Sequence, residues 1–109
     1  MANIIPDAFK SELLSGTHNF ANGGNTFKIA LFTDISGYST SSTTYSTTNE
    51  VSSSGTNYSA GGNALDSQAV SVASNTALVD FADEVFSSVT LSAVGAVIYN
   101  STNSDKLVV

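Results

Sequence analysis

The spacing of apolar residues near the start of the chain predicts a short amphipathic helix within residues 1–17. Ile5, Phe9 and Leu13 recur every four residues, which places them on one face of a helix. Gly16 can adopt the left-handed conformation that ends a helix. Since a helix of about three turns is not stable alone, we expect its apolar stripe to pack on a sheet or on a neighbouring subunit.

Apolar and polar residues alternate over residues 26–33, a pattern that predicts a β-strand. Phe27, Ile29 and Leu31 would share one face of this strand, and Phe32 would make the opposite face partly apolar as well. We therefore expect a strand that is covered on both sides or exposes part of one face to a partner.

The last third of the chain, residues 69–109, predicts an antiparallel β-meander. Its short β-prone runs are separated by Ser, Asn and Asp turns, and they lie at 69–73, 77–81, 89–91, 93–99 and 106–109. The run 93–99 is apolar on both faces, so we expect it to be a central strand. Gly95 within it predicts a close backbone approach or a bulge.

Residues 34–66, which we call the arm, are rich in Ser, Thr, Asn and Gly, with Tyr38, Tyr45 and Tyr58 set among them. Because ordered domains seldom contain a structureless loop of this length, short strands, a fold-back arm or a subunit-binding loop are expected. Tyr offers a large contact area and is enriched at interfaces. Two interpretations stay open, a solvated loop and an arm that orders against another subunit.

Together these elements predict a mainly β (α+β) fold, in which a short N-terminal helix packs on an antiparallel β-sandwich or meander with a long Ser/Thr-rich arm. A chain of 109 residues is long enough for one packed domain and too short for two, so residues 1–109 are expected to form a single domain. Any large binding surface is then expected to be shared between chains.

Charge excludes several classes of partner. Three lysines and no arginine stand against nine carboxylates, for a formal net charge of -6. This balance disfavours binding to nucleic acid, which requires cations against phosphates, and adsorption to anionic membranes. The sequence contains neither an apolar run long enough to span a membrane nor a secretory signal, so we expect synthesis and folding in a cytoplasm.

Few residues are candidates for catalytic chemistry. The chain has no Cys and a single His, which removes thiolate catalysis, disulfides and multi-histidine metal sites. We expect His18 to bond the last carbonyls of the helix, and we interpret Asp80, Asp83 and Glu84 as hydrated turn carboxylates. The sequence therefore predicts no catalytic residue, no metal site, no cofactor and no enzymatic activity.

Four stretches carry a resemblance. They are Ala8-Phe9-Lys10 with Leu13-Leu14-Ser15-Gly16-Thr17-His18-Asn19-Phe20, then Phe27-Lys28-Ile29-Ala30-Leu31-Phe32-Thr33, Tyr58-Ser59-Ala60-Gly61-Gly62, and Gly95-Ala96-Val97-Ile98-Tyr99-Asn100. In this order, covering nearly the whole chain, they resemble a family of small structural proteins of tailed bacteriophages. Members of such a family often continue beyond the position that matches Val109.

The resemblance implies a virion protein made in the cytoplasm of a bacterial host, specifically a capsid decoration (cement) protein. Its expected partners are the major capsid protein or other virion proteins and further copies of itself, with a trimer as the hypothesis. The expected contacts come from the helical stripe and the arm, at Ile5, Phe9, Leu13, Tyr38, Tyr45 and Tyr58. Two alternatives remain open: a tail, neck or fibre component, and a small glycan- or cell-surface-binding β module.

Overall fold

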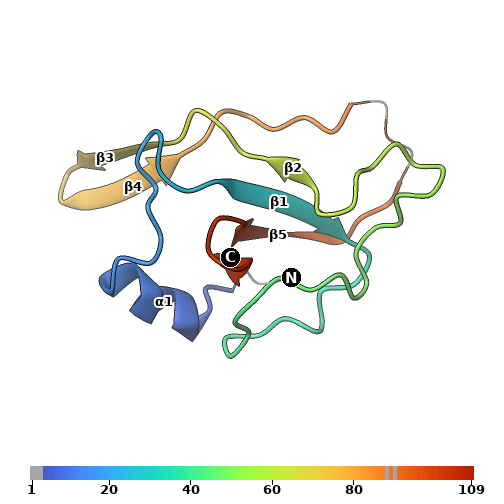
Figure 1. The fold of residues 1–109 in the computed structure, drawn as a ribbon, viewed down its shortest axis with the longest axis horizontal. Helices are drawn as coiled ribbons and strands as arrows, with labels where there is room; N and C mark the ends of the chain where they lie inside the picture. Colours follow the sequence, from blue (N-terminus) through green and yellow to red (C-terminus); the bar gives the residue numbers. More distant parts are fainter. Residues whose placement is uncertain (1–3, 88, 90) are drawn as a thin grey trace.

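The computed structural model describes residues 4–87, 89 and 91–109, and in these residues the chain forms a short helix and two antiparallel sheets (Figure 1). The helix α1 spans Asp7–Leu14. The larger sheet has the order β2-β1-β5-β6, and the smaller sheet pairs β3 with β4. The strands are β1 (Phe27–Phe32), β2 (Asn63–Ala64), β3 (Ala69–Ala73), β4 (Thr76–Asp80), β5 (Gly95–Asn100) and β6 (Lys106–Leu107). The predicted mainly β fold with one short helix is confirmed.

β1 and β5 form the centre of the larger sheet. They pair along their whole length, from Phe27 opposite Asn100 to Phe32 opposite Gly95, which confirms the prediction of a central strand over the run to Tyr99. Gly95 is a point of close approach, because a Cβ there would lie 2.6 Å from Cδ1 of Ile35.

Both faces of this sheet are covered by apolar side chains, as the double-sided pattern of β1 predicts. One cluster contains Ala30, Phe32, Val97, Tyr99 and Leu107, and it is joined by Ile35, Tyr38 and Tyr45 from the arm. The other contains Phe27, Leu65 and Val108, and it is joined by Phe9, Phe20, Ile29, Phe81 and Ile98. The arm therefore covers one face of the sheet, and the helix with the segments beside it covers the other.

Gly16 terminates helix α1 by adopting a left-handed backbone conformation. Its φ is +80°, and the backbone N–H of Thr17 donates to the carbonyl of Glu12 at 2.9 Å. The N–H of Gly16 donates to the carbonyl of Leu13 at 3.4 Å, which completes the hydrogen-bond pair of a Schellman motif. The predicted role of Gly16 is confirmed.

The predicted meander over residues 69–109 is wrong in its topology. β3 and β4 form a separate hairpin that projects at one end of the molecule (Figure 1), whereas β5 pairs with β1. The physical reason is burial: β5 is apolar on both faces and gains most in the middle of the larger sheet, while the hairpin has Ser71 and Asp80 on one face. Val89 and Leu91, predicted as strand, lie outside the strands, and residue 90 lies outside the described residues.

The arm folds back onto its own domain. Isolated β-bridges join Glu50 to Phe32 and Thr44 to Lys106. Further along the arm, the N–H of Tyr45 donates to the carbonyl of Asp105 at 2.9 Å. Of the three arrangements expected for the arm, the structure shows a fold-back arm that contains the short strand β2.

In the described part of the chain, α1 is too short and too polar to cross a membrane.

Candidate functional site

An apolar hollow of about 540 Å³ lies between α1, the β3–β4 hairpin and one face of the larger sheet. Six of the large apolar side chains that line it are substantially exposed, and we call them the helix–hairpin surface: Ile5, Leu13, Val70, Leu78, Val79 and Val109. The most exposed of them is Val70, with 56% of its surface accessible. Contiguous apolar patches on a soluble domain mark contact sites for other molecules.

The structure brings all three predicted helical contact residues to this hollow. Ile5 and Leu13 are about half exposed. Phe9 is less exposed, because its ring contacts the rings of His18 at 5.0 Å and Phe20 at 6.1 Å between centroids. Sequence reasoning missed the hairpin valines, although the alternation of Val70 and Val72 indicated a strand with one apolar face.

Of the three arm tyrosines predicted to contact another chain, Tyr45 and Tyr58 make their contacts within the domain, whereas Tyr38 stays partly accessible. Tyr58 is only 2% exposed, and its hydroxyl donates to Oε2 of Glu50 at 2.6 Å while it accepts from the N–H of Leu31 at 3.0 Å. Tyr45 donates to the other carboxylate oxygen of Glu50 and stacks on Tyr99, with centroids 4.2 Å apart. These rings cover the sheet together with Ile35, because most other residues of the arm are Ser, Thr, Asn and Gly.

Glu50 is the acceptor at the centre of this tyrosine cluster. Its Oε2 also accepts from the N–H of Gly61 at 2.7 Å. Burial, followed by the hydrogen bond to Glu50, raises the pKa of Tyr45 and Tyr58 well above the usual value. Burial, with the nearby charges of Asp105 and Glu50, raises the pKa of Tyr99 to about 12. The phenols therefore stay protonated donors at neutral pH, which suits a structural role.

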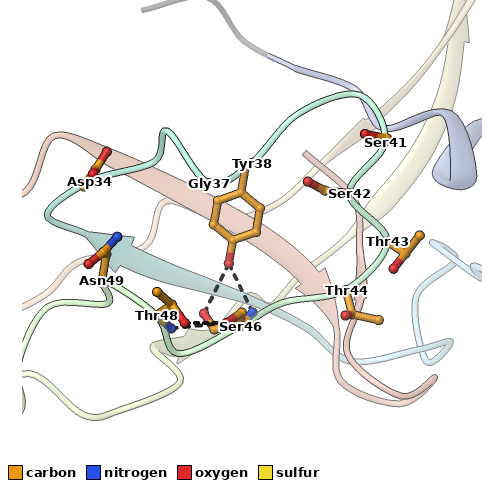
Figure 2. Close-up of a pocket in the computed structure, with 10 residues that line it drawn as sticks. All are labelled: Asp34, Gly37, Tyr38, Ser41, Ser42, Thr43, Thr44, Ser46, Thr48 and Asn49. Carbon is orange, nitrogen blue, oxygen red and sulfur yellow. Dashed lines mark hydrogen bonds between the residues drawn. The ribbon is translucent and has the colours of Figure 1, made fainter.

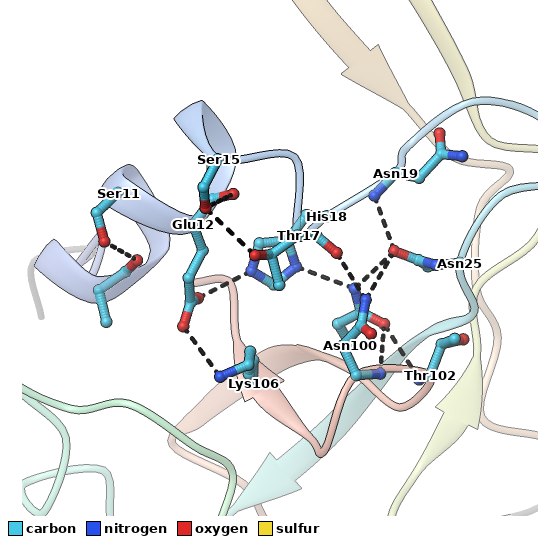
Figure 3. Close-up of polar contacts among 12 residues, drawn as sticks. Ser11, Glu12, Ser15, Thr17, His18, Asn19, Asn25, Asn100, Thr102 and Lys106 are labelled. Atoms are coloured by element: carbon cyan, nitrogen blue, oxygen red, sulfur yellow. Dashed lines mark hydrogen bonds and ion pairs between the residues drawn. The ribbon is translucent and has the colours of Figure 1, made fainter.

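His18 does not bond the helix carbonyls as predicted; its ring turns toward the larger sheet (Figure 3). Nε2 lies 3.0 Å from Oε1 of Glu12, whose Oε2 also pairs with Nζ of Lys106 at 3.4 Å. Nδ1 lies 3.0 Å from Nδ2 of Asn100. Both ring nitrogens are therefore occupied by protein groups.

The hydrogen bonds of Asn100 assign the histidine tautomer. Oδ1 of Asn100 accepts from the backbone N–H groups of Thr102 at 3.1 Å and Asn103 at 3.3 Å, so its amide nitrogen must face His18. Nδ1 of His18 is then an acceptor, and Nε2 carries the proton that it donates to Glu12. This network joins the end of α1 to β5 and serves as a structural connection.

A second hollow, of about 370 Å³, lies within the arm and is polar (Figure 2). We call it the arm hollow. Its walls come from the beginning of the arm at Asp34, from residues 41–44, and from residues 46–49, with Tyr38 between them. Because Tyr38 packs on the arm side of the sheet and Phe9 on the other, this hollow and the helix–hairpin surface lie on different faces of the molecule.

Comparisons with known proteins assign no family to this geometry. No family model, no curated protein and no solved structure matches the chain. The resemblance to phage virion proteins therefore stays a prediction from the residues.

Proposed function

We propose that this chain is a structural protein of a tailed-phage particle, specifically a decoration protein that binds the assembled head and bridges its capsomers. The single observation that carries the proposal is the helix–hairpin surface, where six large apolar side chains stay accessible on a folded domain. The sequence resemblance to phage virion proteins supports the same role. The expected partners are the major capsid protein and further copies of this chain.

The energetics of this surface suit a many-copy assembly. Burying a half-exposed Val, Leu or Ile side chain contributes roughly 1 kcal/mol, so six such side chains contribute a modest amount per copy. Association costs a comparable free energy, because the partners lose translational and rotational freedom. The binding of a single copy is therefore weak. When several linked copies bind at the same time, their combined affinity is much higher than that of one copy. Because a decoration protein binds the assembled shell and not the dispersed subunits, its binding free energy adds to the stability of the shell.

The test is retention on undecorated heads. Purified protein is mixed with heads that lack it, and the particles are sedimented and analysed for bound chain. Val70→Asp places a charge on the most accessible position of the helix–hairpin surface, while Ser53→Asp adds the same charge at an exposed polar position of the arm. We expect the wild type and Ser53→Asp to be retained and Val70→Asp to be lost. Absence of the wild type from the sedimented heads would overturn the proposal.

A role in the tail, neck or fibre is the competing proposal, since the same apolar surface could join copies into rings or elongated assemblies. Particle images with labelled protein distinguish the two roles. Label spread over the head supports decoration, whereas label at one vertex or along the tail supports the competing role. Self-association is measured separately, by the mass of the purified protein in solution, with a trimer as the expected form.

A further inference from the structure

The arm hollow has the size of a small-molecule site, and hydrogen bonds hold its rim. Its volume of about 370 Å³ lies within the usual range for ligand pockets. Its rim is held by backbone and side-chain bonds: the N–H of Ser39 donates to Oγ of Ser42 at 2.8 Å, and the N–H of Ser42 donates to the carbonyl of Ser39 at 3.0 Å. The shape is therefore formed before any ligand arrives, which lowers the entropic cost of binding.

Tyr38 supplies a fixed aromatic surface in this hollow. Its hydroxyl donates to the carbonyl of Ser46 at 3.2 Å and accepts from the N–H of the same residue at 3.1 Å. Behind it, Phe32 packs edge-on with centroids 5.4 Å apart. Figure 2 shows the ring standing between the Asp34 side of the hollow and the Ser41 side. The ring is thus held in one orientation while remaining partly accessible.

Polar groups surround this ring. Oδ1 of Asp34 accepts from the N–H of Ser36 at 2.9 Å, and this bond lowers the pKa of the carboxyl, which keeps it ionised. A carboxylate has about four acceptor positions, so others remain for a ligand. Asn49 is fixed because its carbonyl accepts from the N–H of Thr33 at 2.9 Å, and its side chain extends an amide at the rim.

We propose that the arm hollow binds a neutral saccharide. Hydroxyl, amide and carboxylate groups match the alternating donors and acceptors of sugar hydroxyls, and the negative face of a tyrosine ring attracts the C–H side of a sugar ring. The ten residues that line the hollow include one carboxylate and no cation, which disfavours an anionic ligand. Tyr with Ser and Asn is also the composition of binding loops that recognise diverse polar surfaces. This proposal does not depend on the decoration role, because it uses a different face.

The test is an NMR titration of the full chain with methyl glycosides of neutral hexoses, N-acetylhexosamines and deoxyhexoses. We expect saturable shifts of backbone amides within residues 34–49 for at least one glycoside, with millimolar affinity. Asp34→Ala should weaken this binding at least tenfold, while its remaining amide signals keep the positions of the folded wild-type protein. Asp83→Asn removes a comparable exposed carboxylate elsewhere and should leave the affinity unchanged.

Tyr38→Phe is the second variant, since it keeps the aromatic face and loses only the hydroxyl bonds to Ser46. Retained binding that is weakened a few-fold supports the stacking role. Three results overturn the proposal: no saturable shift with any glycoside, shifts confined to the helix–hairpin surface, or an equal loss in Asp83→Asn and Asp34→Ala. A response of the same amides to Ca²⁺ alone, with none to any glycoside, would show a cation site and would overturn it as well.

Discussion

Asn100 shows how much a single buried amide can determine in this molecule. The residue has no accessible surface, and its side chain bonds His18, Asn25 and two backbone N–H groups in the turn after β5. Its amide therefore fixes the tautomer of the histidine and the course of the chain together. Nothing in the local sequence indicated this role, because the partners come from distant parts of the chain.

Replacing Asn100 with Asp should destabilise the protein. The substitution removes both donors that face Nδ1 of His18 and Oδ1 of Asn25, and it buries a carboxylate beside them. We expect the free energy of unfolding to fall by about 3 kcal/mol in denaturant titrations. Asn22→Asp, at an exposed position, should change it by less than about 0.5 kcal/mol. Equal effects of the two variants would contradict the assigned network.

Gly62 is required for a different reason, the closeness of its backbone to β1. Its φ is +78°, and a Cβ there would lie 2.6 Å from the carbonyl carbon of Ile29 and 2.8 Å from Cα of Ala30. We expect Gly62→Ala to lower the free energy of unfolding by at least about 3 kcal/mol, through strain and overlap together. Gly55→Ala, at φ +72° with open space around it, should lower it by only about 1 kcal/mol. If the two losses were similar, close packing against β1 would not be the cause.

At the scale of elements, the β3–β4 hairpin is the part of the structure that packs least against the rest of the domain. All ten of its strand residues are exposed, and an isolated two-stranded hairpin is only marginally stable in water. Its turn, Ser74-Asn75, has positive φ values of 50° and 67° at both positions, as a type I′ turn requires. The residue types at this turn therefore have an unusually large effect on the stability of the hairpin.

Ser74→Asn should stabilise the hairpin, because Asn adopts positive φ more readily than Ser. We expect the opening free energy of amides in β3 and β4 to rise by about 0.5 kcal/mol, measured by hydrogen exchange. The same substitution at Ser71, in the middle of β3, should lower it, since Asn is unfavourable in strands. An increase at both positions would argue against the turn as the origin of the effect.

At the scale of the whole molecule, stability depends on tyrosines that stay protonated. The pKa of all four tyrosines is raised in the folded chain, with burial as the first cause in each. An unfolded tyrosine ionises near pH 10, so the folded state favours the neutral phenol. This contribution is fully present below about pH 10 and is lost as the pH rises through the folded pKa, which for Tyr99 is about 12.

The free energy of unfolding should therefore fall between about pH 10 and pH 12, and tyrosinate absorbance should lag behind that of the denatured chain over the same range. Glu50→Gln removes the negative charge beside Tyr45 and Tyr58 and should bring their ionisation to lower pH. Coincident titration curves for the native and denatured chains would contradict the buried phenol cluster.

The amount that sequence could predict differs between the fold and the candidate sites. The stripe of Ile5 and Leu13 was expected at a contact surface, and both line the apolar hollow. The hairpin half of that surface was not expected, since the hairpin was placed within a meander. The arm hollow combines residues of three segments of the arm, and no local pattern indicates that such segments meet.

The sequence by itself determined the local features: a short helix terminated by Gly16 and the strands β1 and β5. These depend on periodicity and on the backbone preferences of a few neighbouring residues, which act over short distances. Only the tertiary structure decided that β5 pairs with β1, that the hairpin stands apart and that Tyr45 and Tyr58 make their contacts within the domain. Those outcomes depend on which segments bury the most apolar surface together, a comparison that involves the whole chain at once.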